Sequence, residues 1–193
     1  IPHQNGVDIN LAGVCSGRVE NARKFAEAQG VDAVFESHAE MIESVKPDID
    51  NIVSANNTHG SFVIESAHGG ARLITLEKPP VIWPGYEEGR EASAEVRKRE
   101  SMEYLATVLD AVRASGTKLL YAENFIYVSA VFGMVNILEQ AMKTGKGRIL
   151  HQSGVCAHQG SHAPVYDTPA QSGGGALFNK ACHPLGPILY LKE

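Results

Sequence analysis

The sequence lacks a long apolar segment, an excess of basic residues and an export signal. No apolar run reaches the roughly 20 residues that span a membrane, and the 193-residue chain has a formal net charge of −5. Its first residues, 1–4 (Ile-Pro-His-Gln), have neither the basic start nor the apolar core of a signal peptide. These absences argue against membrane and nucleic-acid partners.

Cysteine is also scarce. The three cysteines, Cys15, Cys156 and Cys182, are odd in number and far apart in the chain. Such spacing is typical of reduced thiols in a cytoplasmic protein rather than of a disulfide framework. We therefore predict a cytoplasmic protein without structural disulfides.

Strand and helix patterns alternate through the first two thirds of the chain. Apolar, β-rich runs predict strands at residues 7–14, 32–35, 49–54, 72–76 and 118–122. Helical periodicity and cap residues predict helices at 19–29, 37–45, 59–68 and 87–114. This order predicts an α/β fold with a parallel, doubly wound sheet in a domain of residues 1–121.

The pattern changes after this point, and we predict a second domain over residues 122–193. A helix is expected at 129–143, and residues 147–155 have the composition of the first strand of another sheet. Residues 158–174 form a long irregular stretch with two prolines. A loop of that length in a compact domain is usually functional or disordered.

A dinucleotide-binding domain should carry a Gly-x-Gly-x-x-Gly turn after its first strand, and this sequence has none. The ribose-selecting residue lies about 20 positions after that turn, at the end of the second strand. If residues 7–14 are the second strand, the turn would therefore precede residue 1. The absence fits a chain without its first strand, and it fits equally a protein that never bound a dinucleotide.

The end of the predicted second strand still indicates a nucleotide preference. It has no acidic residue for a ribose 2′-hydroxyl but carries Ser16, Gly17 and Arg18. A hydroxyl and a cation suit a 2′-phosphate, which favours NADP over NAD. The alternative is that Arg18 is an ordinary solvated arginine in the first turn of a helix.

Two motifs carry candidate chemistry. In residues 73–80 (Leu-Ile-Thr-Leu-Glu-Lys-Pro-Pro) the prolines end a strand and hold Glu77 and Lys78 at its carboxyl end, where α/β proteins bind ligands. Residues 173–184 place Asn179 and His183 four apart, so one helix would present both on one face. An imidazole titrates near neutral pH and can act as an acid or base. The plain alternatives are a solvated Glu77–Lys78 ion pair and a histidine bonded to a backbone carbonyl.

Four blocks, in order, resemble one known superfamily. They are residues 54–59 (Ser-Ala-Asn-Asn-Thr-His), 77–79 (Glu-Lys-Pro), 122–127 (Ala-Glu-Asn-Phe-Ile-Tyr) and 173–183 (Gly-Gly-Gly-Ala-Leu-Phe-Asn-Lys-Ala-Cys-His). They resemble motifs of the glucose–fructose oxidoreductase, inositol dehydrogenase and rhizopine-catabolism (GFO/IDH/MocA) superfamily. The resemblance implies a Rossmann-like parallel sheet lacking its first strand, followed by the start of an α+β domain with an open antiparallel sheet. It also implies a chain cut at both ends.

The resemblance implies hydride transfer between NADP(H) or NAD(H) and a sugar or cyclic polyol, in a protein that is a homo-oligomer when full length. Alternatives within the same fold are a non-catalytic sugar or nucleotide sensor and an NAD-dependent glycosidase. The catalytic residues implied are Lys78, His183 and Asn179; the cofactor-binding residues are Ser16, Gly17, Arg18, Asn56, His59, Glu77 and Lys78; and the substrate-pocket residues are Tyr127, His158 and His162.

The sequence departs from the superfamily pattern at two positions. Asn179 and Ala181 stand where the motif has aspartate and glycine. Because asparagine does not titrate but can position a hydroxyl, proton transfer would depend on His183 and Lys78. This requires Lys78 and His183 to lie on the same side of the molecule.

No metal site is predicted. The set His151, Cys156, His158 and His162 has a spacing that matches no standard zinc pattern. Cys182 beside His183 could be a nucleophile, but neighbours on a helix point apart, so a buried structural cysteine is favoured.

Overall fold

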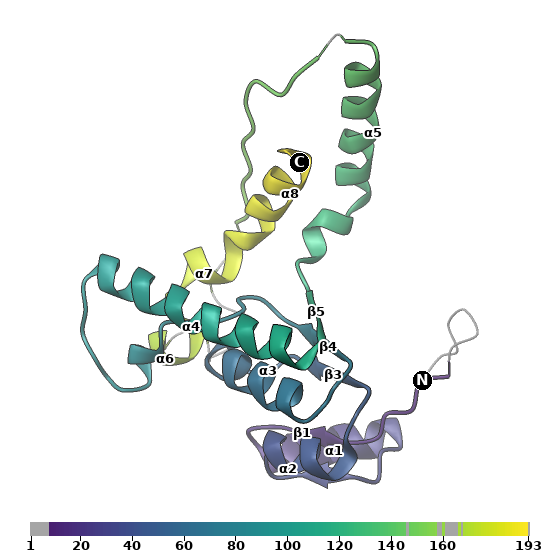
Figure 1. Ribbon diagram of the computed structural model, residues 1–193, viewed down its shortest axis with the longest axis vertical. Coiled ribbons are helices and arrows are strands. Elements are labelled where there is room, and N and C mark those ends of the chain that lie inside the picture. The colour runs from purple at the N-terminus through teal and green to yellow at the C-terminus, as the bar shows by residue number, and fades with distance from the viewer. Residues whose placement is uncertain (1–7, 146, 158–159, 161–165, 167, 193) are drawn as a thin grey trace.

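The computed structural model describes residues 8–145, 147–157, 160, 166 and 168–192. It consists of a parallel α/β part followed by a helical part (Figure 1). The elements of the α/β part are β1 (Val14–Cys15), α1 (Val19–Gln29), β2 (Val34–Phe35), α2 (His38–Val45), β3 (Ile49–Ile52), η1 (Asn56–Thr58), α3 (His59–His68), β4 (Leu73–Leu76), η2 (Pro84–Tyr86), α4 (Ala94–Ser115) and β5 (Lys118–Tyr121). Those of the helical part are η3 (Asn124–Tyr127), α5 (Ser129–Lys143), α6 (Pro169–Ser172), α7 (Ala176–Lys180) and α8 (Cys182–Lys192).

The strands form two parallel sheets, β1–β2 and β3–β4–β5. A doubly wound nucleotide-binding sheet has the order 3-2-1-4-5-6. The pair β2–β1 corresponds to positions 3 and 2 of that order and β3–β4–β5 to positions 4, 5 and 6, while no described strand takes position 1. The predicted parallel α/β fold is therefore confirmed.

The first strand is shorter than predicted. Within the predicted run 7–14, the described residues 8–13 form no regular element, and β1 covers only Val14–Cys15. A strand extends only as far as a neighbour supplies hydrogen bonds. The single partner of β1 is β2, which is two residues long.

The strand predicted over residues 147–155 is wrong. This segment has no regular structure, and the described residues after Tyr121 contain no strand. Leu150 and Val155 are 81% and 92% exposed. This β-rich segment has no neighbouring strand to pair with among the described residues. The extended chain passes along the helices of this part instead (Figure 1).

Helices α3 and α4 cover one face of the β3–β4–β5 sheet and form the main core (Figure 1). Ile74 and Leu76 alternate along β4 into this core and are 0% and 1% exposed. Within the part of the chain that the structure describes, the opposite face has no comparable cover. Ile49, Val53 and Leu120, at or beside strands β3 and β5, are more than half exposed, at 54%, 65% and 55%.

A buried polar cluster joins α2 to the larger sheet. His38, the first residue of α2, contacts Asp50 on β3 at 2.9 Å through Nε2 and Glu65 on α3 at 2.5 Å through Nδ1. Burial alone would lower the pKa of His38, but the hydrogen bonds and charges of the two carboxylates outweigh it and raise the pKa. The pKa of the Cys15 thiol is raised by burial and by the same two acids, so the end of β1 also lies near this cluster.

In the part of the chain that the structure describes, no helix is both long enough and apolar enough to cross a membrane. The longest helix, α4, has charged residues along much of its length. Helices α5 and α8 extend away from the sheets (Figure 1), and both expose large apolar side chains, among them Ile137 and Leu189.

Candidate functional site

The carboxyl ends of β3, β4 and β5 meet at one edge of the larger sheet, where Asn56, Lys78 and Glu123 follow the strands. The strands pair in parallel with Ile52 opposite Leu76 and Leu76 opposite Tyr121, so all three ends are level. This edge is where open α/β sheets bind ligands.

Lys78 is half-buried, and its ammonium is held by the chain itself. Its Nζ donates to the main-chain carbonyl of Asn179 at 2.8 Å. The carboxylate of Glu77 accepts from the backbone N–H of Lys78 at 3.0 Å, so Glu77 is turned back onto the main chain. Lys78 therefore lies between the end of β4 and the C-terminal segment.

Three consecutive glycines turn the C-terminal segment toward this edge. Gly173, Gly174 and Gly175 have φ angles of 80°, 133° and 74°, a region that other residues rarely adopt. A Cβ on Gly173 would also lie 2.2 Å from Cγ2 of Ile82. Backbone conformation thus favours glycine at all three positions, and close packing also requires it at Gly173.

The amide of Asn179 is buried between loops. Its Oδ1 accepts from Nδ2 of Asn56 at 2.9 Å, and its Nδ2 donates to the carbonyls of Gly175 at 2.9 Å and Ser172 at 3.3 Å. Asn56 also donates to the Ser172 carbonyl at 2.9 Å. Because Asn179 is only 5% exposed, its amide joins the loop after β3 to the glycine turn.

His183 contacts a carboxylate rather than a backbone carbonyl. Its Nδ1 lies 2.9 Å from Oε1 of Glu123, and its ring stacks on Phe125 with centroids 4.4 Å apart. Glu123 is 5% exposed and also accepts from the backbone N–H of Phe125 at 3.0 Å. Burial would raise the pKa of Glu123, but the hydrogen bonds from His183, Phe125 and Cys182 outweigh it and lower the pKa.

The prediction that one helix carries Asn179 and His183 is wrong. Helix α7 ends at Lys180, and α8 begins at Cys182. Pro184 explains the break, because a proline lacks the N–H that a continuous helix would need there but is tolerated in the first turn of a new one.

Sequence reasoning did not select two residues of this site, Glu123 and Cys182. The signal for Glu123 was present, because an acidic residue lies two positions after β5, much as Glu77 directly follows β4. Burial, followed by the nearby Glu123, raises the pKa of the half-buried Cys182 thiol, whereas Lys78 opposes the rise. The Cys182 thiol is thus close to both Glu123 and Lys78.

His59 is fully buried and holds two loops together. Its Nδ1 lies 2.7 Å from the carbonyl of Pro79 and its Nε2 lies 3.1 Å from that of Ser54. A neutral imidazole has one N–H, so it can donate to only one of these carbonyls at a time. His59 therefore fixes the Glu-Lys-Pro loop against the end of β3, and any influence on a cofactor would act through that loop.

The turn from β1 to α1 contains Ser16, Gly17 and Arg18. Arg18 is the N-cap of α1 and is exposed, and a Cβ on Gly17 would meet no atom within 4 Å. At the loop after β3, Nδ2 of Asn57 donates to Glu87 at 2.7 Å, while its buried Oδ1 has no hydrogen-bond partner among the described residues. An open turn and an unpaired buried acceptor suit a ligand with hydroxyl or amide donors, so these residues fit a dinucleotide.

The structure brings Lys78 and His183 to the same edge. Lys78 bonds to Asn179, four residues before His183, and its charge acts on the adjacent Cys182. Tyr127 ends η3 and is 67% exposed. The two other predicted substrate residues, His158 and His162, lie outside the described residues. The catalytic, cofactor-binding and substrate-binding roles of all these residues stay predictions.

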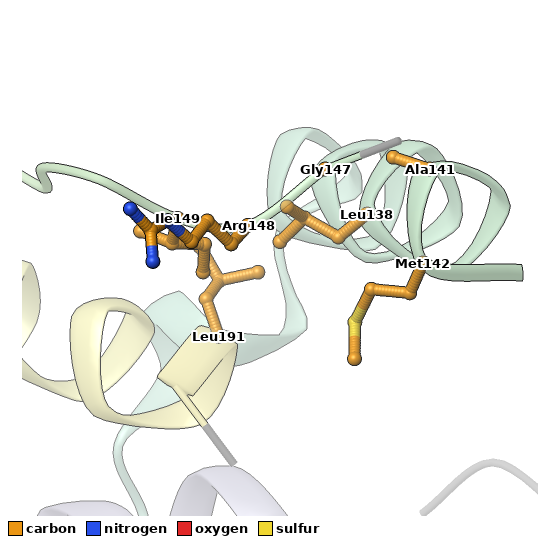
Figure 2. A pocket seen from close by; sticks show the side chains of 7 residues that line it. All are labelled: Leu138, Ala141, Met142, Gly147, Arg148, Ile149 and Leu191. Atoms are coloured by element: carbon orange, nitrogen blue, oxygen red, sulfur yellow. The ribbon is translucent and has the colours of Figure 1, made fainter. Parts of the chain in front are cut away.

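A pocket of about 170 Å³ lies at the opposite end of α8 (Figure 2). Leu191 is one of its lining residues, eight positions beyond His183, which is about 12 Å along a helix. The lining is mainly apolar: Leu138, Ala141, Met142, Gly147, Ile149 and Leu191, with Arg148. This pocket is therefore separate from the edge that carries Lys78.

Comparisons with known proteins agree with the parallel α/β fold. Residues 2–107 match the model of an oxidoreductase family with an NAD-binding Rossmann fold. A D-glucoside 3-dehydrogenase of Escherichia coli (strain K12) is 32% identical over 91 residues, which cover 47% of this chain and 25% of that protein.

Solved structures share the fold at low identity. GenD2 from gentamicin A biosynthesis, in complex with NAD, matches with a TM-score of 0.71 and 16% identity over 94% of this chain and 46% of its own. An aldose-aldose oxidoreductase from Caulobacter crescentus, complexed with glycerol, matches with a TM-score of 0.67 and 17% identity over 95% of this chain and 50% of its own. The chain thus spans half or less of the length of these relatives.

Proposed function

Because the chain belongs to the oxidoreductase family with an NAD-binding Rossmann fold, we propose that it serves in hydride transfer between a nicotinamide dinucleotide and a sugar or cyclic polyol. The observation that carries this proposal is the placement of Lys78 and His183 at one sheet edge, where Lys78 Nζ is bonded to the segment that leads to His183. The D-glucoside 3-dehydrogenase relative supports the substrate class.

The bound nicotinamide would accept or supply the hydride at the substrate carbon. Lys78 would hold the reacting hydroxyl through its ammonium, which the Asn179 carbonyl positions at 2.8 Å. His183 would exchange the hydroxyl proton. The Glu123 carboxylate only accepts hydrogen bonds, so it favours a hydrogen on His183 Nδ1 and leaves Nε2 as the proton acceptor.

In this proposal Asn179 is a positioning residue. Its buried amide has one bond to Asn56 and two to backbone carbonyls. It therefore fixes the carbonyl that holds Lys78 rather than binding a substrate hydroxyl itself. A carboxylate in its place would lose both of these N–H bonds, and the Ser172 carbonyl would keep only its bond from Asn56 and the Gly175 carbonyl only the backbone bond from residue 179.

The proposal is tested by supplying the purified protein with NAD⁺ or NADP⁺ and a panel of alkyl glucosides, aldoses and inositols. Steady formation of reduced nucleotide, followed by its absorbance, is expected for at least one of these compounds. Tight nucleotide binding without turnover on any of them would instead support the sensor alternative. Release of nitrophenol from an aryl glycoside would support the glycosidase alternative.

We further propose that the β1–α1 turn binds the adenosine ribose and that Arg18 favours its 2′-phosphate. Arg18→Ala is expected to weaken NADPH binding by about 10- to 100-fold, because a charge-assisted hydrogen bond contributes about 1.5 to 3 kcal/mol. NADH binding should change little. Fluorescence titration with each nucleotide measures both affinities.

The matched control for this prediction is Arg23→Ala, which removes another exposed arginine from the same helix. It should leave both affinities unchanged. If Arg18→Ala weakens NADH and NADPH equally, Arg18 does not read the 2′-phosphate.

A further inference from the structure

Three different metal-ligand side chains converge beside the proposed catalytic edge. A carboxylate oxygen of Glu123, the Cys182 sulfur and a ring nitrogen of His183 all lie within 4.8 Å of one another. They come from two places far apart in sequence, the N-cap of η3 just after β5 and the start of α8. None of the sequence motifs predicts this cluster.

We propose that Glu123, Cys182 and His183 form a binding site for Zn²⁺. Thiolate, imidazole and carboxylate are the three protein ligands that zinc takes, and three of them leave a fourth position for water or another ligand. The proposal is independent of the proposed function, because it requires neither nucleotide nor turnover.

The distances suit zinc after a small adjustment. Metal–ligand bonds of about 2.0 to 2.3 Å in a tetrahedron place ligand atoms about 3.5 Å apart. Glu123 Oε1 and His183 Nδ1 are already 2.9 Å apart. The distances from the Cys182 sulfur to the other two ligand atoms are at most 4.8 Å, so they exceed the required spacing by about 1 Å or less. A change in side-chain rotamer can close that difference.

The surroundings hold the ligands in place. The backbone N–H of Phe125 donates to the Glu123 carboxylate at 3.0 Å, and the Phe125 ring stacks on His183. Such second contacts orient metal ligands and support affinity. A Cβ on Gly186 would lie 2.8 Å from Cγ of Glu123, so glycine lets α8 approach the carboxylate closely.

Charge balance also suits a divalent cation. Glu123 and the Cys182 thiolate together supply two negative charges, and the thiol proton is released to solvent when the metal binds. The nearby cation is Lys78, whose ammonium is engaged by the Asn179 carbonyl. With zinc on His183 Nδ1, that nitrogen no longer donates to Glu123, so zinc would compete with the proposed proton transfer.

The test titrates reduced, metal-free protein with Co²⁺, whose bond to a thiolate gives a near-ultraviolet charge-transfer absorption, and then displaces it with Zn²⁺. One equivalent is expected to bind with this absorption. Cys182→Ser should abolish the absorption. Glu123→Gln or His183→Gln should weaken metal binding more than about 100-fold, which exceeds the effect of losing a residue that only supports a metal ligand. The matched control, Cys156→Ser, should bind as the unaltered chain does.

A measurement on the unaltered chain covers the case in which a variant fails to fold. Zn²⁺ should protect Cys182, but not Cys156, from iodoacetamide, as measured by mass spectrometry of peptides. The proposal is overturned if no thiolate–cobalt absorption appears, if Cys182→Ser binds as the unaltered chain does, or if zinc leaves the alkylation of Cys182 unchanged.

Discussion

Lys78→Met is expected to lower kcat for hydride transfer by about 10²- to 10³-fold, the usual cost of removing one donor that stabilises a developing negative charge. Methionine matches the length of the lysine stem but removes the ammonium that would hold the reacting hydroxyl. The bond from Lys78 Nζ to the Asn179 carbonyl is lost as well. The loss should appear mainly in kcat, because the interaction is strongest as the hydroxyl loses its proton.

Steady-state kinetics with the best substrate from the sugar and polyol panel measures this loss. Lys118→Met is the matched control, since Lys118 is exposed and begins β5 at the opposite edge of the sheet. It should leave kcat unchanged. If Lys78→Met keeps full kcat, Lys78 takes no part in the chemistry. That result would say nothing against nucleotide binding.

His38→Ala is expected to lower the free energy of unfolding by about 3 to 5 kcal/mol, the usual cost of breaking a buried ion pair by removing one partner. The side chains of His38 and Asp50 are 3% and 6% exposed. Without the imidazole, Asp50 keeps one side-chain donor, Ser66 Oγ at 2.5 Å. Urea unfolding measures the difference, and His68→Ala, an exposed histidine at the end of α3, is the matched control.

The effect of His38→Ala should depend on pH. Asp50 and Glu65 raise the pKa of His38 in the folded state above its unfolded value near 6.5. The stabilisation is then complete below about pH 6.5 and is lost as the pH rises through the raised folded pKa. The gap between the unaltered chain and His38→Ala should therefore narrow as the pH rises above about 6.5 and through the raised folded pKa. A gap that is constant or widens with pH would show that the imidazolium is not the stabilising form.

Helices α1 and α2 could be predicted closely from local sequence, whereas the helix predicted over residues 87–114 begins only at Ala94, after Ser93 as its N-cap. Helix α1 covers Val19–Gln29 as predicted, because Gly30 adopts φ 69° and ends it. Helix α2 begins after Ser37, whose side chain accepts from Glu40 N–H as the capping box requires. Both signals lie within a few residues of the boundary, so no tertiary information is needed.

Strands and the site depend on distant partners and were harder to predict. The β-rich run 147–155 forms no strand because composition does not supply a neighbour. Asn56 and Asn179 were both selected by motif, but their mutual bond joins loops 123 positions apart. Likewise, Glu123 becomes a partner of His183 only when α8 packs against η3, and no local pattern encodes that contact.

The ammonium of Lys78 is anchored by a main-chain oxygen, that of residue 179. Every amino acid carries this oxygen, so the anchor depends on the path of the backbone rather than on the identity of the residue. The asparagine that replaces the aspartate of the superfamily motif therefore leaves this contact in place. A substitution at this position therefore acts on the lysine only indirectly, through the side-chain amide bonds that hold this stretch of backbone in place.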